Sequence, residues 1–467
     1  MTTEPTCQKV AQSRQLAALI FSAAVVFGAS GCKTFSDHTR ATRTALDLGD
    51  LNAALSASNR ALDVKGADSL PADLGKNDAL LLLDRAMVLL ARQEHQLSAR
   101  DFQMADKAVE MLDFSRSTAD EIVRYMFSDS AGPYKARPYE KLMINTMNML
   151  NYLARGNLEG ARVEARRFSV MRDYLLGADK VDHDAVRRAG VPGSYFAGYT
   201  FEKSDVPDAA LRYYDEVLQG IDTPTLSETL GRLMRQSGYR TPRLDAASAR
   251  GNDQAVTANR PSEVFIVVSY GRVPPLVAKR VPIGFALTVA SVFLSATAVK
   301  QANRLAAQGL VTWVNYPEPA PARDDYPVPQ VTIDGSNYPA EVIADVDAVT
   351  RHAWDESKGR VMAAAVTRML TRAAVGAGAG VAVGKASGES GLGVLASMIT
   401  QASMAAADKP DTRSWATLPA RIAVVRAELP PGKHRVEVTV LGRQQRFETN
   451  LESSQWVVVD VTELSTR

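Results

Sequence analysis

Residues 139–176 read YEKLMINTMNMLNYLARGNLEGARVEARRFSVMRDYLL. Apolar side chains recur every three or four positions on both sides of Gly156-Asn157, which predicts two helices with one apolar face each. Glycine accepts the left-handed backbone that ends a helix, and asparagine can cap the next helix, so this pair predicts a turn. The small residues Ala161 and Ala165 would let the two helices approach closely. The stretch therefore predicts an antiparallel helical hairpin of the kind that stacks into arrays.

Other segments predict further hairpins before and after this one. Residues 46–64 resemble the second half of a tetratricopeptide repeat, with a turn glycine followed by small residues at the repeat's offsets. Residues 77–93 and 102–114 predict another pair of helices, and residues 193–221 a fourth. In the last pair the small and aromatic positions match those of the repeat: Gly198, Phe201, Ala210 and Tyr214. Because the spacing is irregular, an ordinary helical bundle remains an alternative to a row of repeat-like hairpins.

The pattern changes to a period of two after residue 262. Runs rich in valine and isoleucine at 263–271, 310–317, 329–334 and 421–429 predict strands bounded by glycine and proline. A meander follows in which Val436, Val438 and Val440 share one face, while charged and polar residues share the other. This alternation predicts an antiparallel sheet with one wet face, within a β-sandwich. The predicted fold class is α+β, with tetratricopeptide-like helical hairpins followed by a β-sandwich-like domain that has helical insertions.

These patterns divide the chain into four parts. Residues 1–31 form a signal peptide, 32–236 a helical repeat-like domain, 237–261 a linker, and 262–467 a β-rich domain. Helical insertions are predicted at about 283–305 and 345–407. The first contains 19 uncharged residues between Arg280 and Lys300, near the length of a membrane span. Two interpretations of 281–299 stay open, a helix packed on the sheet or a membrane segment.

The N-terminus has the layout of an export signal. Lys9 and Arg14 precede an apolar run at 16–29, and the small residues 29–31 lead into Cys32. This resembles the bacterial lipoprotein signal, which implies that Cys32 is lipidated and becomes the mature N-terminus. An ordinary cleaved signal and an anchor helix are the alternatives. By resemblance to the enterobacterial sorting rule, Lys33 in place of aspartate favours the outer membrane.

Composition and motifs limit the function classes. The net charge of +2 implies no polyanionic partner, so no nucleic acid is expected. The glycine- and alanine-rich stretch at 373–393 fails the phosphate-loop pattern, because Ala379 and Ala386 occupy required positions. The five histidines are scattered, and removal of Cys7 with acylation of Cys32 leaves no thiol for a zinc site. No catalytic residue, metal, cofactor or small-molecule substrate is predicted.

Three features carry a family resemblance. They are Cys32, the hairpin beginning at Tyr139, and the pair DTRSWATLPA at 411–420 and LPPGKHRVEV at 429–438. Together they resemble an uncharacterised family of bacterial outer-membrane lipoproteins with a tetratricopeptide-like N-terminal half. Its members are often encoded near lipoproteins that resemble activators of peptidoglycan synthases. The resemblance implies a scaffold or assembly role in the envelope, and it brings no catalytic residues.

The functional prediction is a lipid-anchored protein-binding scaffold that faces the periplasm from the outer membrane. An envelope hydrolase or transferase, acting on cell-wall or lipid material, is the alternative. In stacked hairpins the first helix of each pair lines the concave side. For the hairpin at 139–176 this predicts that five side chains bind an envelope protein: Tyr139, Asn145, Asn148, Asn151 and Tyr152. The competing interpretation is that these side chains are solvated or packed against a neighbouring hairpin.

Overall fold

The computed structural model describes residues 34–114, 134–178, 181–251, 262–307, 313–321, 323, 325–387 and 410–466. The predicted signal peptide and Cys32 lie outside the described residues. So do the second part of the predicted linker and the end of the second helical insertion. The chain forms two compact units. Unit 1 comprises residues 1–37, 278–318 and 358–411, and unit 2 comprises residues 38–277, 319–357 and 412–467.

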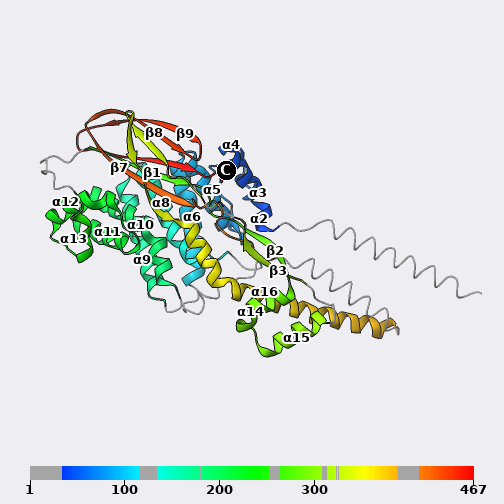
Figure 1. The fold of residues 1–467 in the computed structure, drawn as a ribbon. Helices are drawn as coiled ribbons and strands as arrows, with labels where there is room; N and C mark the ends of the chain where they lie inside the picture. Colours follow the sequence, from blue (N-terminus) through cyan, green and yellow to red (C-terminus); the bar gives the residue numbers. More distant parts are fainter. Residues whose placement is uncertain are drawn as a thin grey trace, which may run out of the picture. The chain divides into compact units, whose positions relative to one another are not determined.

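Helices in unit 2 follow one another as antiparallel pairs (Figure 1). Gly49 and Gly156 adopt positive φ angles of 72° and 66° at two of the turns. Asp50 and Asn157 then cap the following helices, because their side chains accept hydrogen bonds from the amides of Ala53 and Gly160. The pairs are α3 (Arg40–Leu48) with α4 (Leu51–Ala61), α5 (Asp78–Ala91) with α6 (His95–Phe114), α8 (Pro138–Ala154) with α9 (Leu158–Leu176), and α10 (His183–Lys203) with α11 (Pro207–Gly220).

Short helices flank these pairs. They are α2 (Phe35–His38), η1 (Pro224–Leu226), α12 (Ser227–Ser237) and α13 (Pro242–Ser248). The small residues expected in the hairpins do bring helices together. A Cβ atom at Gly198 would lie 2.5 Å from the Tyr214 ring, and one at Gly193 would lie 2.2 Å from the Phe168 ring. Gly198 and Tyr214, matched in sequence to a small and an aromatic position of the repeat, therefore lie against each other.

Two four-stranded sheets in unit 2 make the predicted sandwich. The first, sheet A, has the order β10 (Trp456–Glu463), β1 (Ser262–Tyr270), β7 (Arg421–Leu429), β6 (Glu341–Asp345). The second, sheet C, has the order β5 (Ser336–Pro339), β4 (Gln330–Ile333), β8 (Gly432–Val440), β9 (Arg443–Leu451). Their facing side chains form one core, which includes Val264 and Ile266 of β1 with Val436 and Val438 of β8. The α+β class, with helical hairpins followed by a sandwich, is confirmed.

Strand β1 departs from one expectation. It pairs in parallel with β10 and antiparallel with β7, so sheet A is mixed instead of antiparallel. Every residue of β1 is buried, because alternate side chains face sheet C and the helices. Phe265 stacks on Tyr199 of α10 at 4.3 Å between ring centroids and lies edge-on to Phe196. The wet face belongs to sheet C, whose edge strand β9 alternates half-buried with exposed residues.

Unit 1 contains a two-stranded sheet of β2 (Leu276–Pro282) and β3 (Trp313–Pro319). The uncharged segment forms α14 (Ile283–Ala290), the single turn η2 (Ser291–Phe293) and the start of α15 (Ala296–Ala307), so it is not one helix. Helix α16 (Val346–Ser387) corresponds to the second predicted insertion. Within the described residues, no helix is both long enough and apolar enough to span a membrane. The interpretation of 281–299 as one helix packed on the sheet is not met, because the segment is broken at η2 and many of its side chains are exposed.

The two units do not follow the predicted boundary at 237–261. The hairpins before it and strands β1, β7, β8, β9 and β10 after it belong to the same unit. Helix α13 lies within the predicted linker and packs on α11 and α12. The physical reason is the burial of β1. A strand that is apolar on both faces needs cover on both, and helix α10 supplies it on the side away from sheet C.

Candidate functional site

The side chains predicted to bind a partner lie inside the helical layer. Tyr139, Asn145, Asn148 and Asn151 are buried, and Tyr152 is half-buried. Helix α8 packs against α6, α9 and α10 together, so the faces that flank its apolar stripe are also covered. The expectation that these residues line an open groove is therefore corrected. The structure instead fits the competing interpretation, in which they pack against neighbouring hairpins.

Hydrogen bonds between helices occupy the side-chain amides of Asn145 and Asn151. The Asn145 side chain donates to Glu164 Oε2 at 3.1 Å, and the Asn151 side chain donates to Ser98 Oγ at 2.9 Å. The Tyr152 hydroxyl accepts from the Gln103 side chain at 2.6 Å. Asparagine suits this place because one side chain both donates and accepts, so it can satisfy polar groups on adjacent helices. Their role in the structure is to tie α8 to α6 and α9.

The segment 411–420, which carries part of the family resemblance, is also buried. Trp415 packs edge-on against Phe102 with 5.9 Å between ring centroids. The Trp415 amide donates to Glu140 Oε1 at 3.0 Å, and the Thr417 hydroxyl donates to Asp84 Oδ1 at 2.7 Å. These contacts attach the segment that precedes β7 to helices α5 and α8.

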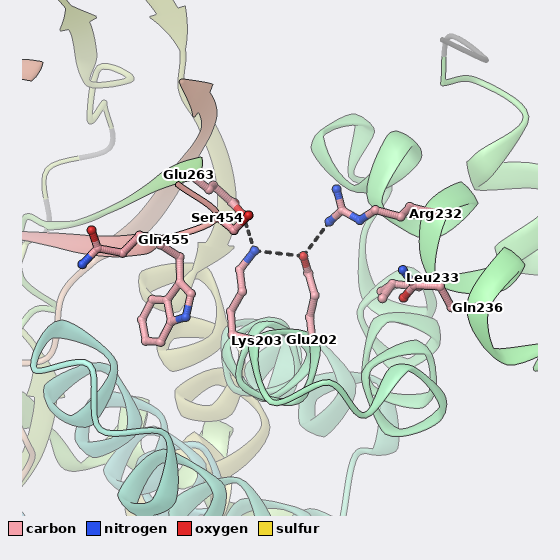
Figure 2. A pocket seen from close by; sticks show the side chains of 9 residues that line it. Glu202, Lys203, Arg232, Leu233, Gln236, Glu263, Ser454 and Gln455 are labelled. Carbon is pink, nitrogen blue, oxygen red and sulfur yellow. Dashed lines mark hydrogen bonds and ion pairs between the residues drawn. The ribbon is translucent and has the colours of Figure 1, made fainter. Parts of the chain in front are cut away.

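A cluster of charged side chains lies where α10 meets sheet A. Figure 2 shows Glu202, Lys203, Arg232 and Glu263 converging around a small cavity, with Gln455 at one side. Arg426 of β7 joins both carboxylates, at 2.8 Å to Glu202 and 2.6 Å to Glu263. Arg232 of α12 lies 2.7 Å from Glu202, and Lys203 bridges the two glutamates. We call these five residues the charge cluster.

The electrostatics of the charge cluster oppose proton transfer. Burial alone would raise the pKa of Glu202, but Arg426 and Lys203 outweigh it and hold that pKa well below its usual value. The same balance lowers the pKa of Glu263. Burial would lower the pKa of Arg426, but the two carboxylates raise it well above normal. Both glutamates therefore stay ionised and paired at neutral pH. The cavity of about 40 Å³ holds a few water molecules at most. The charge cluster therefore has a structural role, because its ion pairs join α10 and α12 to strands β1 and β7.

Three other buried carboxyl groups behave differently. Burial raises the pKa of Asp84, Glu164 and Asp460 to about 7 each. Each lies on a different element, and none lines the cavity beside the charge cluster. The Glu164 carboxylate accepts from Asn145, and Asp460 accepts from the Thr462 hydroxyl at 3.0 Å. No group of three or more metal-binding side chains gathers anywhere in the described ranges.

An exposed apolar surface lies on the outer side of the hairpin formed by α8 and α9. Val163, Val170 and Tyr174 of α9 are 52%, 69% and 46% exposed. Their spacing of seven and four residues places them along one face of the helix. The opposite face, which includes Ala161, Ala165 and Phe168, is fully buried. We call the exposed row the α9 stripe. The sequence pattern contained this signal, since the three residues fall outside the apolar face assigned to the core.

The raised carboxyl pKa values predict how stability depends on pH. Between about pH 5 and 7, folded protein keeps protons on Asp84, Glu164 and Asp460 that unfolded chains have released, so the free energy of unfolding falls as pH rises. Asp84→Asn removes one such group. We expect it to make this slope less negative by about 1.4 kcal/mol per pH unit.

Urea unfolding at several pH values measures this slope. Asp355→Asn changes an exposed aspartate and is the matched control, whose slope should equal that of the unmodified protein. If Asp84→Asn shows the unmodified slope, Asp84 does not take up a proton in this range.

The chain was also compared with known proteins. No protein-family model, curated protein or solved structure matches it.

Proposed function

We propose that this protein is a lipid-anchored scaffold of the bacterial cell envelope, which faces the periplasm from the outer membrane and binds another envelope protein. The α9 stripe is the observation that carries this proposal. Three large apolar side chains stand exposed on one face of α9, although its opposite face is fully buried. Arg166 and Arg167 lie on the turn between Val163 and Val170, and exposed apolar groups bordered by polar ones commonly mark a surface that a partner covers.

The dimensions of the stripe suit a protein segment. Val163 to Tyr174 spans 11 residues of helix, or roughly 17 Å at 1.5 Å per residue. Val163 and Val170 offer apolar area, and Tyr174 adds a hydroxyl at one end. Helix α10 fixes the inner face of α9, so the stripe is presented on a rigid element. A helix or strand laid along α9 would bury all three side chains at once.

The proposed location at the outer membrane rests on the sequence. The N-terminal pattern ending at Cys32 resembles a lipoprotein signal, and the family resemblance places similar chains at the outer membrane. The link to envelope or peptidoglycan assembly rests on that resemblance as well. No observation on the described residues favours the alternative of a hydrolase or transferase, since the carboxylates of the charge cluster are paired with cations.

Site-specific photo-crosslinking in cells tests the partner surface. A photoreactive amino acid at Val170 or Tyr174 should capture one defined envelope protein. Val163→Asp should lower the yield from position 170 about fivefold or more, because burying an unpaired charge in an apolar contact costs at least about 1 kcal/mol. Val163 is exposed, so this change should leave the melting temperature unchanged.

Two control positions make the result specific. A photoreactive group at the buried Asn148 should capture nothing, and one at Gln444 on the wet face of sheet C should capture nothing above background. Capture from Gln444 with none from α9 would move the binding surface to the sandwich.

Mass spectrometry of the mature N-terminus tests the lipid anchor. The expected N-terminal peptide begins at Cys32 and carries fatty acyl groups, and globomycin should make the unprocessed chain accumulate. Cys32→Ser should abolish the acylated peptide. An unmodified N-terminus, or one that begins at another residue, would contradict the anchor while leaving the crosslinking test intact.

A further inference from the structure

Two stretches of unit 1 have a charge composition unlike the rest of the chain. The whole sequence nearly balances 54 basic with 52 acidic residues. Within unit 1, stretches 278–317 and 358–388 contain nine lysines and arginines and no aspartate or glutamate. The nine are Lys279, Arg280, Lys300, Arg304, Lys358, Arg360, Arg368, Arg372 and Lys385. These stretches are therefore strongly cationic within a nearly neutral protein.

Large apolar side chains are exposed in the same unit. Val292 is 88% exposed, and Phe285, Phe293 and Trp313 are each about half exposed. Three of the four belong to α14 and η2, within the uncharged run that Arg280 and Lys300 bound. Both flanking cations are exposed, and Arg280 also donates a hydrogen bond from its Nε to the Asn315 side chain.

Packing within unit 1 holds this apolar tip in place. The inner face of α14 is buried through Ile283, Ala286 and Leu287, which turns Phe285 outward. At η2, the Phe293 ring lies so close to Gly359 that a Cβ atom there would be 2.4 Å away. The Arg360 guanidinium lies 5.8 Å from the centroid of the same ring. A cation is thus fixed beside the exposed aromatic side chain. We use the name cationic tip for the exposed Phe285, Val292 and Phe293 together with the nearby basic residues Arg280, Lys300 and Arg360.

We propose that the cationic tip binds the surface of a lipid bilayer that contains anionic phospholipids. Phe285, Val292 and Phe293 enter the boundary between headgroups and acyl chains, and the surrounding lysines and arginines contact phosphate groups. Amphipathic helices that lie on membranes combine an apolar face with basic flanks in this way. The proposed contact is peripheral, because the three apolar side chains lie on the short elements α14 and η2.

The charge of the cationic tip favours an anionic bilayer over a second copy of the chain as its binding partner. A two-fold contact places the same patch of each copy face to face. Here it would bring the basic residues around Phe293 in one copy against the same residues in the other, and like charges in close contact repel. An anionic bilayer instead supplies the opposite charge over a wide area. Each basic residue near such a surface strengthens binding roughly fivefold.

A fluorescent reporter at the tip tests this proposal in the full chain. Cys7→Ser and Cys32→Ser leave no other thiol, so Val292→Cys can be labelled with an environment-sensitive dye. The dye should shift to the blue with vesicles of phosphatidylglycerol and phosphatidylethanolamine, and stay unchanged with phosphatidylcholine vesicles. A dye at Val170→Cys, which replaces another exposed valine on α9, should not respond.

Charge reversal supplies the matched comparison. Lys279→Glu, Arg280→Glu and Lys300→Glu together should weaken the partitioning that the dye reports by about two orders of magnitude. Lys433→Glu, Arg435→Glu and Arg446→Glu on the exposed face of sheet C change the net charge equally and should leave it unchanged. All variants share the same N-terminal segment, so any binding by that segment is common to them.

Four results would overturn the proposal. They are no shift with anionic vesicles, an equal shift with phosphatidylcholine, an equal loss from both reversals, or a shift without vesicles that grows with protein concentration. The last would assign the tip to a second copy of the chain. None of these results bears on the α9 stripe, whose partner is tested separately.

Discussion

Strand β1 imposes the constraint on which the architecture of unit 2 depends. Its side chains are buried on both faces, so a two-sheet sandwich alone would leave Phe265 and Val267 uncovered. The aromatic side chains Tyr195, Phe196 and Tyr199 of α10 cover that face. Burying such large rings is a major favourable contribution to folding. The helical hairpins are therefore part of the core of the sandwich, and the division expected at 237–261 does not separate them.

Polar contacts fix the register of this junction. The charge cluster places two carboxylates against three cations where α10, α12, β1 and β7 meet. A buried ion pair contributes little net stability, but an unpaired partner is costly, so the cluster favours one arrangement of the elements over others. Glu140 and Asp84 do the same for the segment around Trp415. The cluster looks like an active site in composition, yet every carboxylate in it is neutralised.

Local sequence patterns predicted the individual helices and strands well. They predicted poorly which of these elements pack against one another. The helix-period run at 139–176 and the alternating valines at 436–440 specify a hairpin and a one-sided strand, because periodicity reports which faces are buried. It does not report what buries them. Asn145, Asn148 and Asn151 look like surface residues in a helical pattern, and only α6 and α10, which pack on α8 in addition to its hairpin partner α9, make them internal. The run at 263–270 did indicate burial on both faces, but its parallel neighbour β10 lies almost 200 residues away in sequence. The α9 stripe was readable from the same helix period, since its residues fall outside the core face.

Native-state hydrogen exchange at increasing urea concentrations tests the dependence on β1 most directly. If helices and sandwich share one core, peptides from α10, β1 and β7 should open together with the same urea dependence. Phe265→Ala should accelerate exchange in all three by a similar factor, corresponding to roughly 3–5 kcal/mol for truncating a buried phenylalanine. Opening of α10 while β1 and β7 stay protected, or an effect of Phe265→Ala confined to β1, would contradict a shared core.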